Sequence, residues 1–116
     1  MAKPAATLVQ EATDYASHAP YVALGSNAAS TTAPTEPSGG SPAYARVASN
    51  WGTPNAGTGV DVASPAAINV PSGFTVLSVY FMSASTAGTV WDSAAVTSQA
   101  FASQGTYQPT ITNTPS

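Results

Sequence analysis

The chain has 116 residues, of which two are Lys or Arg and five are Asp or Glu, so that 6% are charged and the formal net charge is −3. Two basic side chains cannot neutralise a nucleic-acid backbone, no apolar run approaches the roughly 18 residues of a membrane span, and the absence of Cys excludes a disulfide scaffold. Composition therefore excludes nucleic-acid binding and membrane insertion and predicts one domain with a thin core.

The low charge leaves two interpretations of the surface open. An exposed surface of Ala, Ser, Thr and Gly suits close packing against other subunits, where burying charges would be costly. It is equally compatible with a free β-domain coated by Ser and Thr. The first interpretation predicts that the isolated domain associates or is marginally stable.

Residues 1–20 are predicted to form an N-terminal arm with a short α-helix of about ten residues. Apolar and small side chains recur at the spacing of one helical face, at Leu8, Val9, Ala12, Tyr15 and Ala16. Thr7 and Gln10 fit a capping box at the start, and Pro20 ends the helix. So short a helix must pack on another part of the protein.

Residues 21–112 are predicted to form a β domain, followed by a polar tail at 113–116. Short β-rich segments separated by turn residues are expected at 21–25, 43–49, 59–63, 67–70, 74–82, 89–91, 94–102 and 107–112, with a long Pro- and Gly-containing loop at 26–42. This spacing is typical of an antiparallel β-sandwich, here of jelly-roll type. The predicted fold class is thus mainly β with a short N-terminal α-helix.

The segment 74–82 is the most apolar of these strands. Both of its faces carry apolar side chains, which predicts that both faces are covered. One cover would be the opposite sheet, and the other would be the N-terminal helix or a neighbouring subunit.

The sequence offers no constellation that suits catalysis, and the protein is not expected to be an enzyme or to hold a cofactor or metal. His18 is the single histidine, and Glu11 and Asp14 lie one turn apart on an exposed helix face. Asp61 and Asp92 could meet as calcium ligands only with help from backbone carbonyls. Arg46 is expected to pair with an acid across the sheet or to stack on an aromatic ring.

The candidate functional residues are therefore interface residues. Trp51 and Trp91 are expected in the core or at an interface. The predicted interface comprises Leu8, Val9, Tyr15, Tyr44 and Trp51.

Several short motifs, in order, resemble those of small virion proteins of tailed phages, which are tail-fibre or head-accessory components. The similarity covers about residues 21–105 and lies in Tyr21-Val22-Ala23-Leu24, Gly39-Gly40-Ser41, Tyr44-Ala45-Arg46, Trp51, Val70-Pro71-Ser72-Gly73 with the following strand, and Gly88–Val96. The chain departs from the pattern by its Pro-rich loop and by Pro42-Ala43 between the Gly39-Gly40-Ser41 and Tyr44 motifs.

The resemblance implies a structural role in the virion. The first hypothesis is a capsid decoration, or cement, protein that binds the major capsid protein and copies of itself, with a trimer as one arrangement. The second is a tail-fibre or tail-tip domain that binds a host receptor through loop 26–42 and exposed aromatics. The third, which comes from another class of protein and not from the resemblance, is a small hydrolase or a lectin-like domain with bound calcium.

Overall fold

The computed structural model describes residues 2–115 and contains one helix and eight strands over that range. The elements are α1 (Ala5–His18), β1 (Tyr21–Gly25), β2 (Val47–Ala48), β3 (Asp61–Ala63), β4 (Ile68–Val70), β5 (Thr75–Met82), β6 (Val90–Ala100), β7 (Gly105–Tyr107) and β8 (Ile111–Asn113). An antiparallel four-stranded sheet has the order β2-β1-β5-β6, and two antiparallel ladders pair β3 with β8 and β4 with β7. The predicted mainly β fold with an N-terminal helix is confirmed, with a second layer made of two separate ladders.

The main core lies between the four-stranded sheet and these two ladders. Val22 and Leu24 of β1 and Val79 and Phe81 of β5 meet apolar side chains from β3 and β4, because alternate residues of a strand point to the same face. The buried members of this core are Ala19, Val22, Leu24, Ala63, Ile68, Val70, Val76, Val79, Phe81 and Phe101.

The other face of the sheet is covered by the first part of the long loop. Ala23, Tyr80 and Met82 form a second, smaller cluster on that face. The hydroxyl of Tyr80 bonds to Asn27, Ala28 and Ser30, which lie in this loop. Both faces of β5 are thus covered as predicted, but a loop, rather than the helix or a neighbouring subunit, covers the second one.

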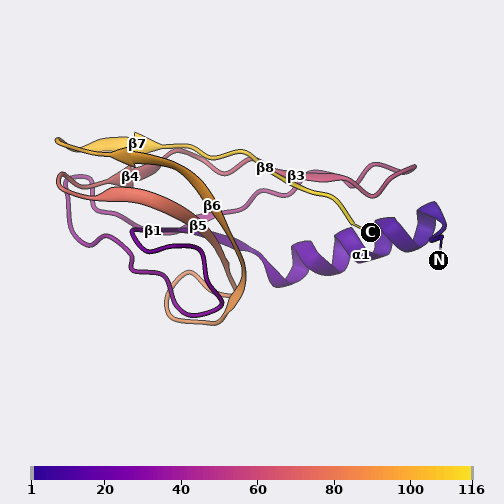
Figure 1. The fold of residues 1–116 in the computed structure, drawn as a ribbon. Coiled ribbons are helices and arrows are strands. Elements are labelled where there is room, and N and C mark those ends of the chain that lie inside the picture. The colour runs from indigo at the N-terminus through magenta and orange to yellow at the C-terminus, as the bar shows by residue number, and fades with distance from the viewer. Residues whose placement is uncertain (1, 116) are drawn as a thin grey trace.

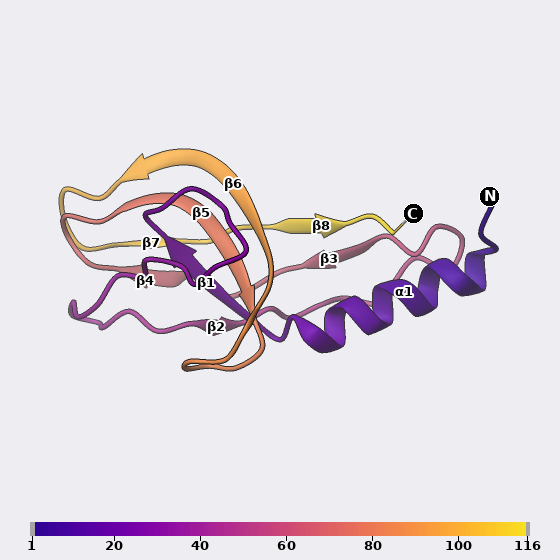
Figure 2. The same cartoon turned by 60° about the horizontal axis from the view of Figure 1, so that its bottom comes forward.

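The molecule is elongated, with extents of 47 × 24 × 24 Å. Helix α1 projects from the end of the four-stranded sheet and runs alongside the β3–β8 ladder, as both views show (Figures 1 and 2). We call α1, residues 52–60 and the β3–β8 ladder the arm, and the four-stranded sheet with the β4–β7 ladder the body. The helix, which was predicted to pack on another part of the protein, therefore lies alongside the β3–β8 ladder within the arm.

Helix α1 is 14 residues long and begins at Ala5, two residues before the expected capping box. No side chain caps its N-terminus; instead Pro4, with φ −67°, precedes the first turn, and its carbonyl accepts hydrogen bonds from the amides of Thr7 and Leu8. The predicted cap at Thr7 and Gln10 was wrong because a proline, whose φ is already helical, starts the helix earlier.

Several strand boundaries differ from the prediction because specific backbone groups are engaged elsewhere. The segment 43–49 forms only the two-residue strand β2, since the amide of Tyr44 bonds to the carbonyl of Gly39 and keeps the preceding residues in the loop. The expected strand 107–112 is two strands, interrupted at Pro109, which has no amide hydrogen. Strand β8 consequently includes Asn113, which was expected in the polar tail.

The expected strands 89–91 and 94–102 are one strand, β6. Asp92 and Ser93, which the prediction left outside both strands, pair with Phe81 and Tyr80 of β5. A polar pair is tolerated there because β6 is an edge strand that is largely exposed to solvent.

The turn 55–59 packs tightly against the helix at one glycine. Gly59 has φ +73°, and a Cβ added to it would lie 2.5 Å from the carbonyl oxygen of Leu8. Gly73 has a similar φ of +84° but open space around it, which makes it a matched control.

We expect Gly73→Ala to lower the free energy of unfolding by about 1–2 kcal/mol through left-handed backbone strain alone. Gly59→Ala should cost about 1–2 kcal/mol more, because the helix must also move. Urea unfolding of both variants checks this difference, and equal losses would show that the arm packs loosely at Leu8.

Candidate functional site

An aromatic cluster joins the end of α1 to the body. The ring of Tyr15 meets Trp51, Phe81 and Trp91 edge-on, with centroid distances of 5.6, 6.1 and 6.1 Å. Trp51 and Phe81 lie 5.2 Å apart, and the indole Nε1 of Trp51 donates to the carbonyl of Ala19 at 2.9 Å. Two residues expected at an interface, Tyr15 and Trp51, therefore bind the helix to the body within one chain.

The hydroxyl of Tyr15 donates to the Oδ2 atom of Asp92 at 2.6 Å. Burial, then this hydrogen bond and the negative charge of Asp92, raise the pKa of Tyr15 far above its usual value. Tyr15 therefore remains a neutral donor that fixes the position of the Asp92 carboxylate on β6. The Oδ1 atom of Asp92 accepts the amide of Ser93 at 2.8 Å.

A concavity of about 400 Å³ lies beside this cluster. The residues that line it come from the long loop and from the start of β6: Ala29, Ser30, Thr31, Val90, Trp91, Asp92 and Ser93. We call it the Trp91 pocket. Trp91 was considered only as a core or interface residue from the sequence, and its place in a pocket depends on a strand irregularity that no local pattern reveals.

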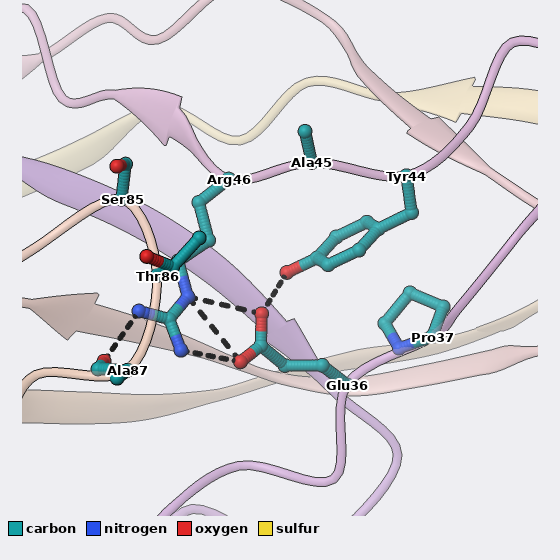
Figure 3. Close-up of a pocket in the computed structure, with 8 residues that line it drawn as sticks. All are labelled: Glu36, Pro37, Tyr44, Ala45, Arg46, Ser85, Thr86 and Ala87. Atoms are coloured by element: carbon teal, nitrogen blue, oxygen red, sulfur yellow. Dashed lines mark hydrogen bonds and ion pairs between the residues drawn. The ribbon is translucent and has the colours of Figure 1, made fainter.

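A second concavity, of about 330 Å³, surrounds an ion pair between the long loop and the residue that precedes β2 (Figure 3). Arg46 and Glu36 meet at 2.6 Å, with 8% and 22% of their side chains exposed. The guanidinium also donates to the carbonyls of Ala84 and Ala87, at 2.9 and 2.7 Å. The predicted pairing of Arg46 with an acid is confirmed, although the acid lies in the loop and not across the sheet.

Tyr44 completes this arrangement, with its hydroxyl 2.6 Å from Glu36 Oε2 (Figure 3). The same hydroxyl accepts a hydrogen bond from the amide of Leu24 at 3.2 Å. Burial would raise the pKa of Glu36, but hydrogen bonds from Arg46 and Tyr44 and the charge of Arg46 outweigh it and hold the pKa below its ordinary 4.5. Burial and the bond to Glu36 raise the pKa of Tyr44. The polar groups of Tyr44, Glu36 and Arg46 form hydrogen bonds to one another. Their interactions attach the long loop to the body.

The remaining predicted interface residues, Leu8 and Val9, lie half-buried on the arm. The five predicted interface residues thus lie in three places: Leu8 and Val9 on the arm, Tyr15 and Trp51 in the aromatic cluster, and Tyr44 beside the Glu36–Arg46 ion pair. The structure does not gather them into one patch. His18, at the last turn of α1, stacks on Trp91 with a centroid distance of 4.4 Å.

The two aspartates considered for calcium have different surroundings. Asp61 is buried, with Oδ1 accepting the amide of Val62 and Oδ2 without a hydrogen-bond partner, whereas Asp92 bonds to Tyr15 and Ser93. Within residues 2–115, no three His, Cys, Asp or Glu side chains are grouped as a metal site. Over the same range no helix has the length and apolar character needed to span a membrane.

Comparison of the chain with protein families, with curated proteins and with solved structures finds no match.

Proposed function

We propose that this protein is a non-enzymatic structural component of a tailed-phage virion, a decoration protein that binds the major capsid protein on the capsid surface. The observation that carries the proposal is the elongated shape, in which the arm projects from the body (Figures 1 and 2). Such an arm can lie on a shell while the body faces outward. The motifs of the sequence that resemble phage virion proteins support the same role.

The outer face of α1 is the part of the arm that suits contact with the shell. A shallow concavity of about 500 Å³ runs along it and is lined by the small and polar side chains of Ala6, Thr7, Gln10, Glu11 and Asp14. The small side chains of Ala6 and Thr7 allow close approach of another protein backbone, and the carboxylates of Glu11 and Asp14 would have to meet polar or basic groups of the shell. Copies of this chain would also contact one another in such an array, with a trimer as the arrangement to test.

The test is binding of the purified protein to capsids that lack it, measured by co-sedimentation and by counting copies in images. We expect saturation at a fixed ratio to the major capsid protein. Ala6→Glu, which places a charge in the helix contact, should weaken binding by roughly tenfold or more. Thr106→Glu, exposed on β7 at the far end of the body, should bind like the unmodified protein.

A tail-fibre or tail-tip domain is the second candidate function. The Trp91 pocket favours it, because residues of the long loop and an exposed aromatic ring line it together. A few copies at the tail and none on the shell would support this candidate and contradict decoration.

A further inference from the structure

The pocket beside Trp91 exists because β6 bulges at that residue. Val90 pairs with Met82 and Asp92 pairs with Phe81, so that Trp91 has no partner in β5. A bulge of this kind redirects the side chain of the extra residue. Trp91 is 43% exposed, and among residues 2–115 the only other large apolar side chain of comparable exposure is Val62, at 38%.

The exposed indole is held in place by the helix. His18 stacks against it with an interplanar angle of 17°, and the ring of Tyr15 approaches it edge-on. The neighbouring Asp92 carboxylate is fixed by Tyr15 and by the amide of Ser93. An aromatic surface and a carboxylate are thereby positioned next to each other before any ligand arrives.

The opposite side of the pocket is held just as firmly. The hydroxyl of the buried Tyr80 receives a hydrogen bond from Asn27 at 2.9 Å, donates to the carbonyl of Ala28 at 3.1 Å and lies 3.1 Å from Ser30 Oγ. The Ser93 hydroxyl donates to the carbonyl of Ser30 at 2.7 Å, which joins the loop directly to β6. These bonds hold Asn27, Ala28 and Ser30 in place and reduce the entropy lost when a ligand binds.

The side chains that line the pocket define its chemistry. They supply one indole, one carboxylate and the hydroxyls of Ser30, Thr31 and Ser93, and no basic group. An aromatic surface suits the apolar C–H face of a sugar ring, while a carboxylate and hydroxyls accept and donate hydrogen bonds to its hydroxyl groups. The volume of about 400 Å³ falls within the roughly 300–1,000 Å³ of small-molecule sites.

We propose that the Trp91 pocket is a binding site for a neutral saccharide, which packs on the part of the Trp91 indole that His18 and Tyr15 leave uncovered and bonds through its hydroxyls to Asp92. The negative charge of Asp92 and the net charge of −3 disfavour anionic sugars. This activity goes beyond attachment to a virion, because a protein bound to either the capsid or the tail could present the pocket outward.

The experiment titrates the purified full chain with the methyl glycosides of glucose, galactose and mannose and with N-acetylglucosamine, followed by tryptophan fluorescence and saturation-transfer NMR. We expect at least one of them to bind with a dissociation constant of about 1 mM. Trp91→Ala should weaken binding at least tenfold and Asp92→Asn several-fold. In Trp91→Ala the remaining tryptophan, Trp51, should show no fluorescence response to the sugar.

Thr31→Arg serves as a second variant, since Thr31 is exposed and its replacement fills the pocket without touching the core. It should abolish binding while circular dichroism stays unchanged. The proposal is overturned if no neutral sugar binds saturably at about 50 mM, if Trp91→Ala and Thr31→Arg bind as well as the original, or if sialic acid binds more tightly than every neutral sugar. Capsid binding of Thr31→Arg, measured separately, shows whether virion attachment survives the loss of sugar binding.

Discussion

Replacing Phe81 with alanine should lower the free energy of unfolding by about 3–5 kcal/mol, the usual cost of removing a buried phenylalanine. The Phe81 side chain is 3% exposed and contacts both Tyr15 of the helix and Trp51, which lies between β2 and β3. Its loss leaves a cavity between the helix, Trp51 and the sheet, and a 14-residue helix gains most of its stability from such packing. Urea unfolding followed by far-ultraviolet circular dichroism measures the change.

Leu77→Ala is the matched control for this experiment. Leu77 lies on the same strand but is only half-buried and belongs to neither apolar cluster. We expect it to cost about 1 kcal/mol. Similar losses for the two variants would contradict the central position of Phe81.

Replacing Glu36 with glutamine should destabilise the protein by about 2–4 kcal/mol. The Arg46 guanidinium would remain buried without its counter-charge, and breaking a buried ion pair by removing one partner is strongly destabilising. We place the effect below the maximum for such pairs because Glu36 is 22% exposed. Glu11→Gln, which breaks the more exposed Lys3–Glu11 pair, should cost less than about 1 kcal/mol.

A double-mutant cycle isolates the pair itself. Glu36→Gln combined with Arg46→Met should cost at least about 1 kcal/mol less than the sum of the two single changes, because neither charge is then left alone. Additive losses would mean that Glu36 and Arg46 contribute to stability independently of each other.

The pair also makes stability depend on pH in a defined direction. Since the pKa of Glu36 is lower in the folded protein than its ordinary 4.5, the stabilisation is fully present above that value. It is lost as the pH falls through the folded-state pKa. Unfolding measured at pH 7 and at pH 3 should therefore show a smaller acid loss for Glu36→Gln than for the unmodified chain.

Local sequence patterns predicted those elements in which the backbone preference of the residues and their apolar pattern favour the same structure. The strand 21–25 has the predicted bounds, and 74–82 differs from β5 by a single residue. The first is a short apolar segment between Pro20 and a loop, and β-branched and aromatic side chains dominate the second. The N-terminal helix was predicted from its apolar spacing, but its start depends on Pro4. The sequence pattern did not predict β6 as one strand, because polar Asp92 and Ser93 interrupt the apolar positions of this mostly exposed edge strand.

The sites were harder to predict because they depend on residues far apart in the chain. Tyr15 and Asp92 are 77 positions apart, and Glu36 meets Arg46 only after the long loop folds back. Pairing with an acid was one of two roles expected for Arg46, and the sequence could not identify which acid it would meet. The Trp91 pocket depends on a bulge, a relation between two strands that neither strand encodes alone.

The outer edge of β6 bears on the solubility of the protein at high concentration. The strand is 11 residues long and carries one charged residue, Asp92, with neither lysine nor proline to deter another strand from pairing with it. Two register shifts against β5 limit its regular stretch to Asp92–Ala95, and bulges twist an edge away from incoming strands. Protection against open-ended polymerisation is thus supplied by backbone geometry, so the bulge that turns Trp91 outward also discourages fibre growth.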